Sequence, residues 1–249
     1  ETYAYFKKLG ATPIQALNEV KQTPTYWGEQ PIVEAPAYIG AVVIFLFILA
    51  LYLVKGPEKR WLIIGTVMSL LLSYGKNLEF LTDLFIDYFP LYNKFRAVSS
   101  IQVILELCIP ILAVLGLKEL IAKGHDKKEQ VKALKNTLFI TLGITVTLLI
   151  FKNSLFDFVG SNDVRFISAY GQGFIDAVKS DRIAFFINDT LRTLILVLVS
   201  AGTIWFFLKE KISSITLASI ILAITGVLLM VGNSLSPGEM SGNLAAFSM

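Results

Sequence analysis

GKNLEFLTDLFIDYFPLYNKFRAVSS, residues 75–100, lies between two long apolar runs and alternates aromatic side chains with single charges. At helical spacing Leu84 and Tyr88 fall on one side of this stretch. Asp83 and Asp87 fall on another side. An apolar face next to a carboxylate face is typical of a helix that lies in a membrane interface. The only proline of the stretch ends the predicted helix, because proline has no backbone N–H to donate.

The composition indicates an integral membrane protein. Hydrophobic residues make up 55% of the 249 positions, charged residues make up 16%, and the mean hydropathy is +0.66. A net charge of +3 without Lys/Arg runs gives no indication of nucleic acid as a partner. The single Cys108 and the single His125 have no partners at metal-ligand spacing, so we expect no metal site. Without a Gly-rich phosphate loop or a hydrolase motif, we also expect no cofactor.

Six apolar segments follow the first 37 residues, and a span of the bilayer needs about 20 residues. The sequence therefore predicts an all-α fold: a polytopic helical membrane protein of about six transmembrane helices, with short interfacial helices in its extracytoplasmic loops. The second and fourth segments are short, so they either take in flanking residues such as Gly75 and Leu134 or lie in a locally thinned bilayer. The predicted spans are Tyr38–Val54, Trp61–Tyr74, Val98–Leu117, Leu138–Phe151, Leu191–Leu208 and Ile212–Val231.

Basic residues set the predicted orientation in the membrane. Half of the 22 Lys and Arg residues lie in three short connections, 55–60, 118–135 and 209–211. The positive-inside rule places these connections in the cytoplasm and both ends of the chain outside it. We therefore expect a multi-pass protein of the bacterial inner membrane.

The predicted domain organisation follows from this orientation. No signal peptide begins the sequence, and its polar opening resembles the middle of a protein, so we expect an internal piece of a longer chain. The parts are an extracytoplasmic segment at 1–37, a six-span domain at 38–231 with outer loops at 75–97 and 152–190, and an extracytoplasmic tail at 232–249.

The second outer loop contains charged residues for which we favour a structural role. Residues 174–188 predict two short amphipathic helices that separate at Ser180–Asp181. Asn188, Asp189 or Thr190 can then cap the fifth span. We interpret the four charged residues near these points as helix caps and interfacial ion pairs: Asp181, Arg182, Asp189 and Arg192.

Two groups of residues have both an anchoring and a binding interpretation. Lys94 and Arg96 precede the third span and can anchor it to headgroups or bind a lipid phosphate. Tyr26 and Trp27 suit an interfacial aromatic belt, and their rings can also stack on a sugar.

Two polar residues lie inside the third predicted span. Gln102 and Glu106 are one helical turn apart, and an ionisable group in a span costs about 2.5–3.5 kcal/mol on insertion scales. Glu106 either faces a polar cavity as a base or proton carrier, or is a neutral acid that hydrogen-bonds between helices.

Several blocks of sequence resemble the YfhO family of bacterial membrane proteins, in the form found in Bacteroidetes. These blocks are PTYWGEQP (24–31), AYIGAVV (37–43), LSYGKN (72–77), LFIDYFPLYNKFRAVSS (84–100) and DRIAFFINDTLR (181–192). The sequence after Val231 departs from the family pattern. Members of the family resemble GT-C glycosyltransferases, multi-span enzymes that use a polyprenyl-phosphate-linked sugar at the outer membrane face.

The resemblance implies transfer of a sugar from a polyprenyl-phosphate donor to an extracytoplasmic glycan or lipid acceptor. The GT-C catalytic carboxylate usually follows the first span of the full protein, so no catalytic residue is assigned in this chain. The alternatives are a transporter or lipid flippase with a polar relay at Gln102 and Glu106, or a non-catalytic membrane scaffold. For a transferase, the expected phosphate ligands are Lys94, Arg96 and Lys76, and the expected sugar or acceptor contacts are Tyr26, Trp27, Asn77, Tyr92 and Asn93.

Overall fold

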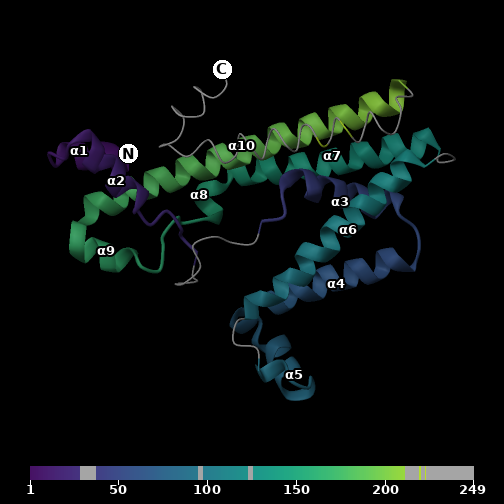
Figure 1. Cartoon of the computed structure of the whole chain (residues 1–249), viewed down its shortest axis with the longest axis horizontal. Coiled ribbons are helices and arrows are strands. Elements are labelled where there is room, and N and C mark those ends of the chain that lie inside the picture. Colours follow the sequence, from purple (N-terminus) through teal and green to yellow (C-terminus); the bar gives the residue numbers. More distant parts are fainter. Residues whose placement is uncertain (29–37, 95–97, 123–125, 211–218, 220–221, 223–249) are drawn as a thin grey trace. The chain divides into compact units, whose positions relative to one another are not determined.

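The computed structural model describes residues 1–28, 38–94, 98–122, 126–210, 219 and 222 (Figure 1). Throughout these residues every regular element is a helix, which confirms the all-α part of the prediction. The α-helices are α1 Thr2–Lys8, α2 Pro13–Lys21, α3 Ala41–Leu53, α4 Pro57–Ser73, α5 Glu79–Tyr88, α6 Gln102–Ile121, α7 Lys127–Ile150, α8 Lys152–Leu155, α9 Asp163–Tyr170 and α10 Gln172–Glu210. Three short 3-10 helices are η1 Gly75–Leu78, η2 Tyr92–Lys94 and η3 Val98–Ile101.

Two of the described helices, α7 and α10, are long and apolar enough to cross a membrane. Helix α7 begins at Lys127 and so extends the expected fourth span on its N-terminal side, as predicted for a segment that was too short. The first three predicted spans correspond to α3, α4 and α6. The sixth predicted span, 212–231, lies outside the described residues except for two isolated positions.

The chain divides into two compact units. Unit 1 comprises residues 1–36, 143–195 and 218–249, and unit 2 comprises residues 37–142 and 196–217. Residues of the opening segment and of the outer loop 152–190 belong to the same unit. Helices α7 and α10 each contribute to both units.

In unit 2, α6 packs against α3 and α4 through small residues. A Cβ atom at Gly116 of α6 would lie 2.8 Å from the Cα atom of Ala50 in α3. A Cβ atom at Gly65 of α4 would lie 2.9 Å from the sulfur of Cys108. Close approach at small residues is how helices associate where lipid removes the hydrophobic driving force. Leu112 and Ala50 are fully buried at the α3–α6 contact.

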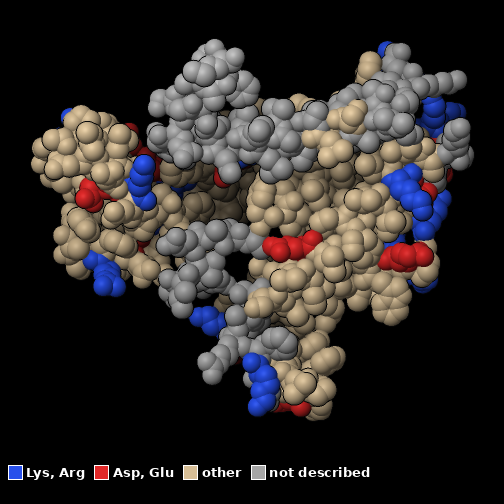
Figure 2. Space-filling view, in the orientation of Figure 1, with Lys and Arg blue, Asp and Glu red and all other residues tan. Residues whose placement is uncertain are grey.

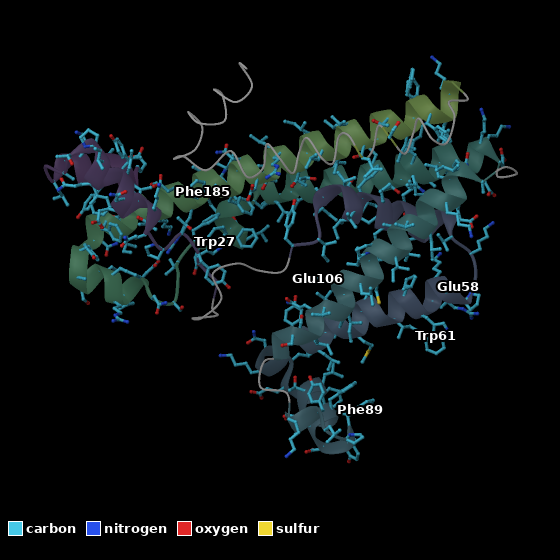
Figure 3. The ribbon with its side chains drawn as sticks, viewed as in Figure 1. Trp27, Glu58, Trp61, Phe89, Glu106 and Phe185 are labelled. Carbon is cyan, nitrogen blue, oxygen red and sulfur yellow. The ribbon has the colours of Figure 1, made fainter. Side chains whose placement is uncertain are left out.

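The outward faces of the same helices are apolar. Trp61 of α4, which Figure 3 labels, is 72% exposed, and Val103 and Val114 of α6 are each more than 60% exposed. Large contiguous apolar surfaces are rare on soluble monomers and mark contact with lipid or with another protein.

Side chains from neighbouring helices satisfy the carbonyl groups at three helix ends in unit 2. The Lys59 ammonium donates to the carbonyl of Leu51, near the end of α3, at 2.6 Å. Gln130 of α7 in the same way donates to Leu120 of α6 at 3.0 Å. The third pair joins Lys127 Nζ to the carbonyl of Leu208, near the end of α10, at 3.1 Å. The last carbonyls of a helix have no partner within it, and cations are favourable there because they oppose the helix dipole.

Helix α5 forms as predicted and ends at Tyr88, two residues before the proline. The Thr82 hydroxyl holds the helix to η1 by donating to the Gly75 carbonyl at 2.8 Å. Phe80 and Tyr88 are about 80% exposed, which leaves the apolar face of α5 uncovered among the described residues. Phe89 follows the helix and stacks on Phe85 with the ring centroids 4.9 Å apart (Figure 3).

In unit 1, α1 and α2 form on either side of Gly10, close to the predicted break. Gly10 adopts a φ of 89°, which suits glycine. Thr12 caps α2 because its hydroxyl accepts from the Gln15 N–H, while the Gln15 side chain accepts from the Thr12 N–H. Pro13 occupies the first turn of α2, where its missing N–H is not needed.

The predicted break at Ser180–Asp181 is wrong, because α10 is one continuous helix of 39 residues. After Gly173 the segment up to Thr190 contains neither glycine nor proline, so no residue interrupts the helix. The predicted cap of the fifth span at positions 188–190 is wrong for the same reason. Thr190 instead donates its hydroxyl to the Phe186 carbonyl one turn earlier, at 2.7 Å.

Candidate functional site

The candidate site lies in unit 1 and rests on a small aromatic core. Phe6 of α1 and Phe174 of α10 are buried there with their ring centroids 5.7 Å apart. Val178, one turn further along α10, is fully buried in the same cluster. This packing joins the opening segment of the chain to α10 and positions the next turn of that helix.

Arg182 is the central residue of the site and is fully buried. Its guanidinium donates to both carboxylate oxygens of Asp163, at 2.6 and 2.8 Å. The same group donates to the carbonyls of Phe158, at 2.9 Å, and Pro24, at 2.7 Å. A planar guanidinium suits such a bidentate pair and still has donors for backbone carbonyls. Arg182 thereby holds the opening segment, the loop before α9 and α10 together.

The loop that receives Arg182 has a constrained backbone. Phe158 has a φ of 56°, a conformation that costs a residue with a side chain about 1–3 kcal/mol. Gly160 lies so close to the ion pair that a Cβ atom there would be 3.0 Å from Asp163 Oδ1 and 3.1 Å from an Arg182 nitrogen. A side chain at this position would crowd the ion pair.

Asp163 is ionised within this arrangement. Burial by itself raises the pKa of the carboxyl group, but hydrogen bonds from Arg182 and from the Gly160 N–H, together with the positive charge of Arg182, outweigh it. The pKa of Asp163 consequently lies below its ordinary value of 3.8. The carboxylate and the guanidinium compensate each other's charge at neutral pH.

A cavity of about 480 Å³ opens beside this ion pair. Its wall combines an aromatic ring (Tyr26), an amide (Asn162), a hydroxyl (Ser161) and an ammonium group (Lys21). Because Arg182 and Asp163 neutralise each other, Lys21 supplies the net charge of these side chains. An aromatic ring with several hydrogen-bonding groups suits a polar ligand such as a sugar. We call this cavity the Tyr26 pocket.

The structure brings two of the sequence-predicted residues, Tyr26 and Arg182, together in the Tyr26 pocket. Trp27 instead packs its ring against Phe158 with the centroids 5.4 Å apart (Figure 3). Asp181 accepts a hydrogen bond from the Thr2 N–H at 2.9 Å and so has a structural role.

The remaining charged residues of α10 lie further along the helix. Asp189 is exposed and Arg192 is half-buried. Both lie within the continuous α10, so neither occupies the first turn of a separate fifth helix.

The predicted phosphate ligands belong to unit 2. Lys76 in η1 and Lys94 in η2 are exposed. Arg96 lies outside the described residues. The structure therefore gives Lys76 and Lys94 as accessible cations and does not describe the third member of the group.

The other predicted contacts in unit 2 have different surroundings. Asn77 is exposed, and the half-buried Tyr92 ring packs 5.5 Å from Phe85. Asn93 belongs to η2, but its side chain lies outside the described residues. Gln102 is half-buried on α6, and Glu106 is exposed one turn later (Figure 3).

Sequence reasoning missed the partners of Arg182. Asp163 lies 19 residues away and Pro24 lies 158 residues away, so no helical spacing relates them to Arg182. The signal that was present is a loop between helices that contains Gly160 three residues before Asp163, because functional groups concentrate on such loops.

Comparisons with protein-family models, curated proteins and solved structures found no match for this chain.

Proposed function

We propose that this chain is the multi-span part of a YfhO-type, GT-C-like glycosyltransferase of the bacterial inner membrane. It crosses the membrane about six times, with both ends on the extracytoplasmic side. The protein transfers a sugar from a polyprenyl-phosphate donor to an extracytoplasmic glycan or lipid acceptor. The Tyr26 pocket takes the sugar.

The observation that carries this proposal is the composition of the Tyr26 pocket. Its walls come from residues 21–28 and from the region of 160–182, which the positive-inside rule assigns to the same extracytoplasmic side. An aromatic ring, an amide and hydroxyl groups are the side chains that bind sugars through stacking and hydrogen bonds. A sugar on a lipid carrier is presented at the membrane surface, where loops between spans meet it.

The membrane placement has its own support in the outward faces of the helices. Trp61 and Val114 lie on exposed apolar surfaces, while Gly116 and Ala50 form a close helix contact. Small residues between helices and large apolar residues outside them are the pattern of a membrane bundle.

The expected ligands of a donor phosphate, Lys94, Arg96 and Lys76, belong to unit 2 and are tested separately from the Tyr26 pocket of unit 1. Inverting transfer needs a stabilised phosphate leaving group, and cations at headgroup depth supply that stabilisation. The alternative, a transporter or lipid flippase, would use Gln102 and Glu106 as a polar relay and would transfer no sugar.

Binding with and without the sugar tests the proposal. The protein in detergent is titrated with a short-chain polyprenyl-phosphate sugar and with the same polyprenyl phosphate lacking the sugar. We expect tighter binding of the sugar-bearing ligand and a loss of that difference in Tyr26→Ala. Loss of stacking and of one hydrogen bond corresponds to roughly threefold to tenfold in Kd.

Tyr3→Ala is the matched control, because Tyr3 is an exposed tyrosine of the same unit that does not line the pocket. Equal affinity for the two ligands in the wild-type protein would refute sugar binding at this pocket. Equal loss in Tyr3→Ala and Tyr26→Ala would place the sugar elsewhere.

A further inference from the structure

We propose that a basic groove in unit 2 binds the headgroup of an anionic phospholipid. The groove lies between the end of α3 and the first half of α7 and has a volume of about 370 Å³. A second hollow of about 440 Å³ lies along α7 and shares Lys132 and Asn136 with the first. We call the two together the basic groove, and the residues that define it are Tyr52, Lys55, Lys128, Lys132, Lys135 and Asn136.

Five lysines line the two hollows, and one of them, Lys127, donates to the Leu208 carbonyl. The other four, Lys55, Lys128, Lys132 and Lys135, are exposed, and none of them has an ion-pair partner in the part of the chain that is described. Glu129 is the one carboxylate among the residues that line the two hollows. Figure 2 shows blue Lys and Arg side chains gathered where α4 and α7 begin and where α6 ends. The groove therefore attracts an anion.

The arrangement of the lysines opposes the stability of α7 itself. Lys128 and Lys132 are four residues apart, and Lys135 follows after three, so like charges are neighbours on one face. Lys128 also lies in the first turn of the helix, where the dipole disfavours cations. A local arrangement that costs stability is expected where the side chains have a function, and a bound anion would remove both penalties.

Buried residues of α7 at and beside the groove fix its backbone. Gln130 is 4% exposed and donates to the Leu120 carbonyl. Ala133 and Leu134 are buried. These contacts hold the helix while Lys132 lines the groove, so the site is present before a ligand arrives.

A phospholipid fits this groove better than a soluble anion because α7 becomes apolar directly after the lysines. The helix continues into the apolar segment Leu138–Ile150, and Phe139 at its start is 81% exposed. Tyr52, which lines the groove, is a residue typical of membrane interfaces. A phosphodiester bound by Lys55 and Lys132 would thus have its acyl chains beside exposed apolar side chains. Basic pockets between helices on the cytoplasmic side bind anionic headgroups in this way.

This inference rests on the proposed membrane placement, and short-chain phosphatidylglycerol in detergent tests it directly. Short-chain phosphatidylcholine is the reference ligand, and native mass spectrometry measures the bound lipid. We expect the wild-type protein to bind phosphatidylglycerol in preference to phosphatidylcholine. The Lys55→Gln/Lys132→Gln variant should bind phosphatidylglycerol more weakly, by about fivefold for each lysine removed. Lys55→Arg/Lys132→Arg keeps both charges and should retain the affinity.

The control Lys7→Gln/Lys8→Gln removes the same charge from exposed positions of α1 in unit 1. Unchanged phosphatidylglycerol binding in the groove variant, or equal binding of the two lipids by the wild-type protein, would overturn the proposal. Displacement of the lipid by inorganic phosphate would also overturn it, because the groove would then take a free anion. Alkaline extraction of membranes tests the placement separately. If alkali extracts the protein and the protein still prefers phosphatidylglycerol, the lipid site in the groove is supported and the membrane placement is refuted.

Discussion

Gly116 of α6 lies directly against Ala50 of α3. A Cβ atom built at Gly116 would be 2.8 Å from the Cα atom and 3.2 Å from the nitrogen of Ala50, and closer still to its methyl group. Ala50 is fully buried, so no flexible side chain can move aside. Backbone contact between the two helices therefore depends on the absence of a side chain at position 116.

We predict that Gly116→Ala destabilises the protein. The added methyl group forces α3 and α6 apart, and overpacking of this kind costs about 1–3 kcal/mol. The thermal unfolding midpoint in detergent measures the effect. Gly143→Ala in α7 is the matched control, because nothing lies within 4 Å of a Cβ atom there. It should leave the midpoint unchanged or raise it, since alanine favours a helix by about 0.8–1 kcal/mol over glycine. Equal effects of the two substitutions would argue against the close contact.

The Arg182–Asp163 pair should make unit 1 sensitive to removal of either partner. Asp163→Asn leaves the guanidinium buried without its counter-charge, and breaking a buried pair in this way costs about 3–5 kcal/mol. Trp27 reports on the change because its ring contacts Phe158, so fluorescence is measured with the other tryptophans replaced, as Trp61→Phe and Trp205→Phe. Asp157→Asn in the same loop is the control, because Asp157 is exposed and an asparagine can still accept from the Val159 N–H. A similar small effect of both substitutions would contradict the role of the pair.

The same pair predicts how stability depends on pH. Because the pKa of Asp163 is lower in the folded state, its stabilising contribution is complete above the ordinary pKa of 3.8. The contribution is lost as the pH falls through the lower pKa of the folded state. Denaturant unfolding of the single-tryptophan protein between pH 6 and about pH 2 should show this loss in the wild-type chain and a smaller loss in Asp163→Asn. Identical pH profiles would exclude Asp163 as the titrating group.

Cysteine labelling tests the predicted orientation. Replacement of the native thiol in Cys108→Ala gives a background for single cysteines at the exposed positions Ser161 and Lys128. In intact cells an impermeant reagent should label Ser161→Cys and should reach Lys128→Cys only after the membrane is opened. The reverse pattern would invert the topology, and equal labelling of both would refute the membrane placement between them.

Binding of the donor phosphate tests Lys94 and Arg96. Loss of a hydrogen bond to a charged group costs about 1.5–3 kcal/mol, which corresponds to roughly tenfold to hundredfold weaker binding of polyprenyl phosphate in Arg96→Ala. Arg96→Lys should lose less, because lysine keeps the charge but not the bidentate geometry. The control is Lys7→Ala, which removes an exposed charge from unit 1. Unchanged affinity in a well-expressed Lys94→Ala/Arg96→Ala protein would leave these residues as anchors of the third predicted span.

The local sequence pattern was sufficient to predict most of the described helices. Helix α5 formed before the predicted stop at Pro90, and the apolar runs became α3, α4, α6 and α7, because helix formation depends on spacing and breakers within a few residues. The same local reasoning failed at α10. Serine and aspartate favour helix ends in general, but in α10 Asp181 accepts from the Thr2 N–H near the start of the chain instead of ending the helix.

The sequence by itself determined the helical class, the apolar segments and the uneven distribution of basic residues. Each of these is a property of composition or of neighbours along the chain. Only the tertiary structure decided that Arg182 pairs with Asp163, that Pro24 completes the arrangement and that Gly116 lies against Ala50. Such contacts form when segments far apart in sequence pack together. A buried charge then pairs with whichever polar or charged groups the packing brings within hydrogen-bond distance.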